Sequence, residues 1–165
     1  MTEFTQNDMA LHFRRKDVGH LRFISLSVAI LGLCGMGISG YLTYGYLVNV
    51  SIGCPFNENC DLVQASPYAY MWSVPVPLLG LLMYAALTVM GFLLFLKKPE
   101  WENILSLGMY AISLAGVILT GYLYYLELFV LHAFCSWCIV SSIVILSIFI
   151  LSLIYLKNIN RSAIY

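Results

Sequence analysis

Four long runs of apolar residues, separated by shorter polar stretches, dominate the chain. They cover residues 23–48, 74–96, 104–126 and 134–156, and none of them contains Asp, Glu, Lys or Arg. Because about 20 helical residues cross the hydrocarbon core of a bilayer, each run is long enough to be a transmembrane helix. Short connections make sequential helices antiparallel neighbours. The pattern therefore predicts an all-α integral membrane protein, a bundle of four transmembrane helices.

The positions of the basic residues predict how this bundle is oriented. We expect residues 1–22 and 157–165 to be tails, and residues 49–73 and 127–133 to be loops that contain no Lys or Arg. All eight basic residues lie elsewhere: Arg14, Arg15, Lys16, Arg22, Lys97, Lys98, Lys157 and Arg161. An excess of Lys and Arg marks the cytoplasmic side of a membrane protein. The termini of the membrane domain, residues 23–156, should therefore face the cytoplasm, and both basic-free loops should face the opposite compartment.

The composition excludes several classes of protein. Hydrophobic residues make up 61% of the 165 residues and charged residues 10%, against about 45–50% and about 25% in soluble domains. This balance excludes an ordinary cytosolic enzyme and a disordered chain. Eight basic residues are matched by eight acidic ones, so the chain also lacks the basic surface of a nucleic-acid-binding protein.

Four of the five cysteines lie on the predicted outer side. Cys54 and Cys60 occupy the first outer loop, and Cys135 and Cys138 form a Cys-x-x-Cys motif at the outer start of the last span. Cys34 lies in the middle of the first span, where a cysteine usually behaves as a small hydrophobic residue. Disulfides persist outside the cytoplasm, for example in the bacterial periplasm, so an even number of cysteines there indicates pairing.

Structural disulfides and a four-cysteine zinc site are the alternatives to a redox role. The five-residue gap between Cys54 and Cys60 fits the usual spacing of zinc ligands poorly. A disulfide within Cys-x-x-Cys closes a small ring and restricts the unfolded chain little, whereas such pairs are often redox-active. Two pairs on one side of the membrane therefore favour an electron relay.

The position of the Cys-x-x-Cys motif supports this interpretation. Cys135 should fall in the first turn of a helix, where unpaired backbone N–H groups and the helix dipole favour a thiolate. Cys138 should lie on the same face, roughly 4.5 Å deeper along the axis. A lipid-soluble oxidant could reach this inner sulfur, while the outer sulfur could exchange with protein thiols.

These motifs in combination resemble the vitamin K epoxide reductase family, in its bacterial disulfide-forming branch without a fused thioredoxin domain. The matching features are Cys54-x5-Cys60-Asp61, Ser66, Val74-Pro75-Val76-Pro77 with Gly80 and Tyr84, and Phe134-Cys135-Ser136-Trp137-Cys138. Another four-helix family, of the bacterial disulfide bond protein B type, carries its Cys-x-x-Cys in the first outer loop. Here the order is reversed. Ser142 stands where some relatives carry Tyr, and Ser73 where Gly often stands.

The resemblance implies a membrane thiol:quinone oxidoreductase that supports disulfide formation. Cys135 and Cys138 would be the active-site pair, with Cys138 next to the quinone, and Cys54 and Cys60 would be a loop shuttle. Ser66 would lie near the quinone ring. The electron acceptor would be ubiquinone or menaquinone, no metal would be required, and the partner would be a soluble thioredoxin-fold protein in the periplasm. The protein would be a multi-pass protein of the bacterial inner membrane.

Two alternative functions remain open at this point. One is a vitamin K epoxide reductase proper, and the other is a non-enzymatic bundle stabilised by disulfides. Two further polar residues lie near the second outer loop. His132, three residues before Cys135, could handle a proton or simply be solvated. Glu127 directly follows the third span, and we expect it at the polar interface.

Overall fold

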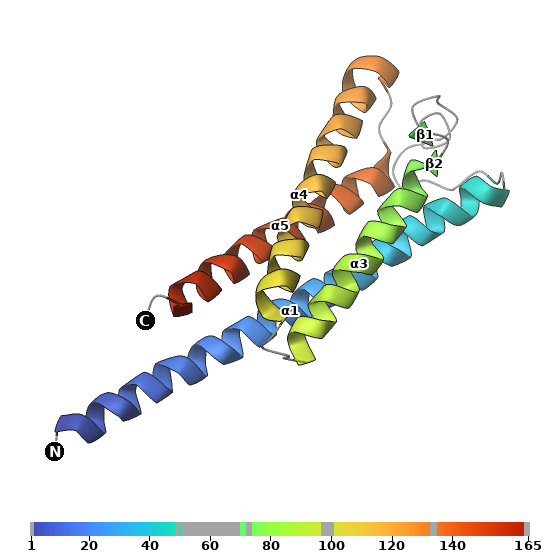
Figure 1. The fold of residues 1–165 in the computed structure, drawn as a ribbon. Helices are drawn as coiled ribbons and strands as arrows, with labels where there is room; N and C mark the ends of the chain where they lie inside the picture. The colour runs from blue at the N-terminus through green and yellow to red at the C-terminus, as the bar shows by residue number, and fades with distance from the viewer. Residues whose placement is uncertain are drawn as a thin grey trace.

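The computed structural model describes residues 2–48, 50, 70–71, 74–96, 101–132 and 135–163. Its principal elements are α1 (Thr2–Val48), α3 (Val76–Leu96), α4 (Glu102–Leu126) and α5 (Ser136–Ala163) (Figure 1). Within the described residues, each of these helices contains a stretch long and apolar enough to cross a membrane. The predicted all-α bundle of four transmembrane helices is confirmed.

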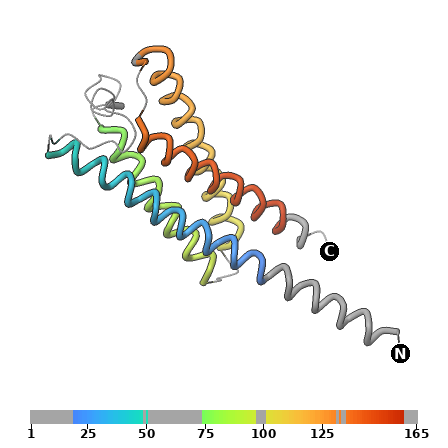
Figure 2. Tube along the Cα trace, turned by 180° about the vertical axis from the view of Figure 1, so that it is seen from behind, coloured from blue at the N-terminus to red at the C-terminus, as the bar shows by residue number. Residues whose placement is uncertain are grey.

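Neighbouring helices run antiparallel and close into a ring. α1 packs against α3, α3 against α4, α4 against α5, and α5 against α1. The end of α1, the start of α3, the end of α4 and the start of α5 therefore meet at one end of the bundle, as both ribbon views show (Figures 1 and 2). The helix ends that border the two predicted outer loops are thus on the same side of the bundle.

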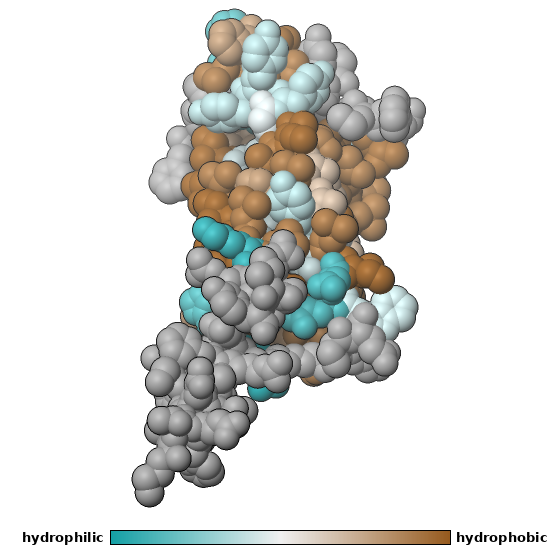
Figure 3. All heavy atoms as spheres, turned by 60° about the vertical axis from the view of Figure 1, so that its left-hand side comes forward, coloured by the Kyte–Doolittle hydropathy of each residue, from teal (hydrophilic) through white to brown (hydrophobic). Residues whose placement is uncertain are grey.

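The outer surface of the bundle is apolar. Large side chains on all four helices point outward, among them Phe23, Leu82, Leu107 and Ile143. Figure 3 shows a brown hydrophobic band around the middle of one face, with pale and teal residues above and below it. Such a surface would be a large exposed apolar patch in water, whereas in a bilayer it faces lipid chains. The distribution of side chains therefore agrees with a membrane-embedded bundle.

Small residues bring α1 and α3 into close contact. Gly35 of α1 lies directly against the ring of Tyr84, and Gly91 of α3 lies against the backbone of Ser25 and Ala29. A Cβ atom on Gly91 would stand 3.0 Å from the Ala29 nitrogen. Helices in membranes associate through such small residues because lipid supplies no hydrophobic driving force between them. The interior of the bundle is then filled by fully buried side chains such as Leu87.

Helix α3 begins two residues later than the predicted span. Val74–Pro75 forms strand β2, which pairs antiparallel with strand β1, Tyr70–Met71. A residue before proline is disfavoured in the helical region, which accounts for the extended conformation of Val74. The helix then starts at Val76, with Pro77 inside its first turn, where proline is tolerated.

The second outer loop is shorter than the sequence predicted. Residues Glu127–Leu131 form a π-helical turn, η3, that continues directly from α4, although we expected them in the loop 127–133. His132 ends this turn in the left-handed conformation, φ 48°, and its backbone N–H donates to the Glu127 carbonyl. The prediction was wrong because it ended the helix at the first charged side chain. In the structure this side chain is buried inside the bundle instead of facing solvent.

Candidate functional site

Cys135 caps the N-terminus of α5. It immediately precedes Ser136, its carbonyl accepts the Ile139 N–H at 3.1 Å, and its sulfur accepts the Cys138 N–H at 3.4 Å. A side chain at this position normally satisfies one of the unpaired N–H groups of the first turn. The sequence predicted Cys135 in the first turn of the helix, whereas it lies one residue before that turn. Its sulfur still interacts with the helix N-terminus.

The surroundings of Cys135 stabilise its thiolate. The side chain is 1% exposed. A hydrogen bond from the Cys138 thiol is the largest influence and lowers the pKa of Cys135, and the backbone N–H groups of Cys138 and Trp137 lower it further. Burial and the nearby Glu127 carboxylate oppose this effect. The expected thiolate-favouring position therefore has a specific cause, which is mainly the second cysteine of the motif.

Cys138 lines a cavity inside the bundle. The cavity is partly open, has a volume of about 820 Å³ with its mouth included, and is bounded by residues from all four helices. Cys135 is not among its lining residues. Pockets for small organic molecules are commonly lined mostly by apolar side chains, with a few polar groups. One sulfur of the motif thus borders a largely apolar space, while the other is not among the residues that line it.

The walls of the cavity are mainly apolar, with a few polar groups. Among the apolar residues are Leu42, Pro77, Leu79, Met83, Leu119 and Ile145, and the polar ones include Ser39, Tyr84, Thr120, Tyr124, Glu127, Ser141 and Ser142. Gly116 and Gly80 also line the cavity, and their missing side chains let Ile145 and Ser39 approach closely. A quinone, with an apolar ring and two carbonyl oxygens, fits this mixture of surfaces.

Tyr84 connects α3 to α5 at one wall of the cavity. Its hydroxyl donates to the Ser141 carbonyl at 2.8 Å and lies 2.9 Å from the Ser141 hydroxyl. Ser142, beside it, donates to the Cys138 carbonyl at 2.7 Å. Tyr84 was singled out in the sequence only as part of a motif, and the structure gives it a contact with the helix that carries the cysteines.

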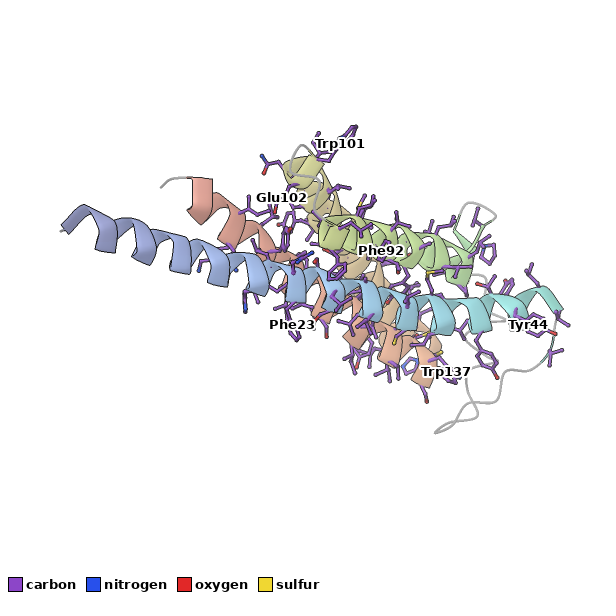
Figure 4. The ribbon with its side chains drawn as sticks, turned by 90° about the horizontal axis from the view of Figure 1, so that it is seen from below. Phe23, Tyr44, Phe92, Trp101, Glu102 and Trp137 are labelled. Atoms are coloured by element: carbon purple, nitrogen blue, oxygen red, sulfur yellow. The ribbon has the colours of Figure 1, made fainter. Side chains whose placement is uncertain are left out.

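Trp137, between the two cysteines, turns away from the cavity. Its ring packs against Tyr41 of α1, with centroids 5.5 Å apart and planes 58° apart. Figure 4 shows it near the same end of the bundle as Tyr44. The aromatic residue of the motif therefore fastens the start of α5 to α1.

Glu127 is the residue that sequence reasoning misplaced. Instead of lying at the polar interface, it is 3% exposed and lines the cavity together with Cys138. Its carboxyl group interacts with the Cys138 side chain and the Cys135 backbone. One signal could have found it. Residues 127 and 135 are equally far from residue 131, so an antiparallel turn centred there places them level with each other.

The remaining candidate residues divide into two groups. Cys54, Cys60, Asp61 and Ser66 lie outside the described residues. Cys34 is exposed on the outer face of α1, and His132 is exposed at the turn before Cys135. The structure therefore brings together Cys135 and Cys138 with Glu127, and it places Cys34 and His132 away from the cavity.

Comparison with known families bears directly on this arrangement. The model of the Vitamin K epoxide reductase family matches residues 26–153, most of the chain and all of the cavity-lining residues. The chain belongs to the vitamin K epoxide reductase family. No curated protein matches it significantly. The family resemblance noted from the motifs is thereby confirmed.

Members of the vitamin K epoxide reductase family are membrane oxidoreductases that use redox cysteines and quinone-type substrates. The chain is accordingly a multi-pass membrane protein of the oxidoreductase class. Its apolar cavity with one cysteine at the wall is consistent with this chemistry. In this chain a small hydroxyl side chain, Ser142, lines the cavity.

Proposed function

We propose that the protein is a thiol:quinone oxidoreductase that supports disulfide formation. Electrons would pass from a reduced thioredoxin-fold protein to the Cys54–Cys60 pair, then to Cys135 and Cys138, and finally to a membrane quinone. The observation that carries this proposal is that the two cysteines of the motif have different surroundings. Cys138 borders the apolar cavity, whereas Cys135 lies outside it.

The burial of Cys135 favours an intermediate shuttle. With 1% of its surface exposed, Cys135 offers a bulky soluble protein little access to its sulfur. Thiol–disulfide exchange requires a thiolate to attack a disulfide sulfur directly, and the Cα atoms of a bonded pair lie within about 7 Å. A short segment such as that carrying Cys54 and Cys60 could make this approach where a whole protein could not.

The lowered pKa of Cys135 suits its place in the relay. Cys60 would attack the Cys135–Cys138 disulfide at Cys135, and Cys138 would leave. Cys54 would then attack Cys60 in the resulting mixed disulfide, and Cys135 would leave as a thiolate. This thiolate would re-form the disulfide with Cys138 as two electrons pass to the quinone. A thiol with a lowered pKa is a good leaving group and is present more often as the reactive anion.

Orientation and location follow from the charge distribution. We propose that both termini are cytoplasmic and that the cysteine pairs face the periplasm of a bacterial inner membrane. The basic residues Arg22, Lys97 and Lys157 support this arrangement because they stand before the first span, between the second and third, and after the fourth.

The decisive experiment is oxidation of a reduced thioredoxin-fold protein by the purified protein, with loss of a short-chain quinone followed at the same time. Wild type is compared with Cys138→Ser and with Cys34→Ser, a matched control because Cys34 is exposed on the far surface of α1. We expect stoichiometric quinone loss in wild type and Cys34→Ser, and none in Cys138→Ser. Well-folded wild type that consumes neither ubiquinone nor menaquinone would instead favour a structural role for the disulfides.

A further inference from the structure

Glu127 is an acidic side chain buried within a membrane-spanning bundle. It is 3% exposed, and its Oε2 atom has no hydrogen-bond partner within the part of the chain that the structure describes. Burying a carboxyl group without full pairing is costly. Ionisable side chains inside membrane spans therefore usually mark functional positions.

The dipole of α4 does not account for this burial. Glu127 lies at the C-terminal end of α4, where a negative charge is unfavourable to the helix dipole. Glu102, at the opposite end of the same helix, is the instructive contrast. It lies at the favourable N-terminus and accepts a hydrogen bond from Tyr155 at 3.1 Å. Of these two acidic residues, Glu102 stabilises α4, whereas the charge of Glu127 is unfavourable to its dipole.

The contacts of Glu127 point to the reacting sulfur. Its carboxyl group shares a side-chain hydrogen bond with Cys138 and also interacts with the Cys135 backbone. Both Glu127 and Cys138 line the cavity. The same carboxyl group therefore reaches the thiol that would donate electrons and the space in which the acceptor would be held.

We propose that Glu127 carries the proton from Cys138 to the bound quinone, an inference that rests on the proposed thiol:quinone activity. The Glu127 carboxylate takes the proton of the Cys138 thiol and then gives it to a carbonyl oxygen of the quinone. The sulfur–sulfur bond between Cys135 and Cys138 forms as two electrons pass to the quinone. The second proton comes from Cys135 or, when Cys135 is already a thiolate, from solvent. The products are one disulfide and one quinol.

The titratable groups around Glu127 are few. Cys135 and Cys138 face it from the start of α5, and Tyr84 of α3 and Tyr124 of α4 share the cavity. No Lys, Arg or His is among the residues that line the cavity in the described part of the chain. Among these groups, Glu127 is the carboxyl, and a carboxyl ionises more readily than a tyrosine or an ordinary thiol.

The test isolates the quinone step. Wild type, Glu127→Gln, Glu127→Asp and Glu102→Gln are reduced in advance and mixed with a short-chain ubiquinone in a single turnover across a range of pH. Glu102→Gln is the matched control, because Glu102 lies at the far end of the bundle from Trp137 (Figure 4). General acid–base catalysis typically contributes about 10²–10⁴-fold. We expect Glu127→Gln to slow quinone reduction by at least about 100-fold and to lose the acidic limb of the pH–rate profile, with partial recovery in Glu127→Asp.

A second measurement needs no quinone. Infrared difference spectra between the oxidised and reduced cysteine pair should contain a carboxyl band that is absent in Glu127→Gln and present in Glu102→Gln. Equal quinone-reduction rates in wild type and Glu127→Gln, or identical infrared spectra for the two, would overturn the proton-carrying role of Glu127 but leave the proposed function standing. Failure of wild type to reduce any quinone would instead overturn the proposed function.

Discussion

The sulfur of Cys135 accepts the backbone N–H of Cys138 at 3.4 Å. The first cysteine of the motif is thereby the N-terminal cap of α5, and the second is one helical turn further into the bundle. The relationship gives the two sulfurs different surroundings, although only two residues separate them. Cys135 interacts with the helix N-terminus, and Cys138 borders the cavity.

The ionisation of Cys135 should depend on Cys138. Because the hydrogen bond from the Cys138 thiol is the largest cause of the lowered pKa of Cys135, Cys138→Ala should raise that pKa towards the ordinary value. Cys138→Ser, which keeps a hydroxyl donor, should raise it less. Ultraviolet absorbance of the thiolate, titrated in the reduced protein, measures the midpoint. As the pH falls through this midpoint Cys135 becomes protonated, so wild type should keep its thiolate to lower pH than either variant. Coincident midpoints would contradict the assigned cause.

Close packing of α1 on α3 should make Gly35 intolerant of a side chain. A methyl group at Gly35 would run into the ring of Tyr84, and overpacking of this kind typically costs about 1–3 kcal/mol. A Cβ atom added to Gly37, on the same helix, would have no neighbouring atom within 4 Å. Gly37→Ala should therefore be neutral or stabilising by up to about 1 kcal/mol through helix propensity. Thermal unfolding in detergent should separate the two variants, and equal melting temperatures would contradict the packing argument.

Loss of the Tyr84 hydroxyl should weaken the wall of the cavity. Tyr84→Phe removes the bonds to Ser141, and a typical hydrogen bond contributes about 0.5–1.5 kcal/mol. We expect a modest fall in melting temperature and a raised KM for quinone, because the cavity wall is less firmly held. Tyr122→Phe is the control, since Tyr122 is half exposed. Ser141→Ala should have a smaller effect than Tyr84→Phe because the Ser141 carbonyl still accepts the bond. A KM that is unchanged in Tyr84→Phe would contradict this role.

Residues at opposite ends of the bundle should be accessible from opposite sides of the membrane. Gly19 and His132 are both exposed. In a background with the native cysteines replaced, Gly19→Cys and His132→Cys report the two sides with a membrane-impermeant maleimide. On intact cells the cysteine at 132 should react and that at 19 should not, whereas both should react after the membrane is disrupted. The reverse pattern would show an inverted protein.

The sequence carried most of the information about the fold. The helices could be predicted because a span that crosses lipid needs about 20 apolar residues without charge, a constraint visible along the chain. The antiparallel arrangement of sequential helices could be predicted because the connections between them are short. The Cys-x-x-Cys spacing of Cys135 and Cys138 was visible in the sequence, and the family match over residues 26–153 confirms the family that the motifs had indicated.

The ends of the elements were less predictable. The π-helical turn at Glu127–Leu131 was predicted as a loop, since a charged residue after an apolar run normally marks the membrane boundary. Whether such a residue faces water or turns inward depends on what packs beside it. Here the start of α5 packs beside it, and that contact joins residues on different helices.

The sequence by itself determined the class of protein and the number of spans, and it indicated candidate redox cysteines, because hydropathy and cysteine spacing are local properties of the chain. Only the tertiary structure decided that Cys138 borders a cavity, that Cys135 caps a helix, and that Glu127 is buried beside both. A cavity is formed where four helices fail to fill the space between them, and this depends on side chains far apart in sequence, such as Ser39, Gly80 and Gly116.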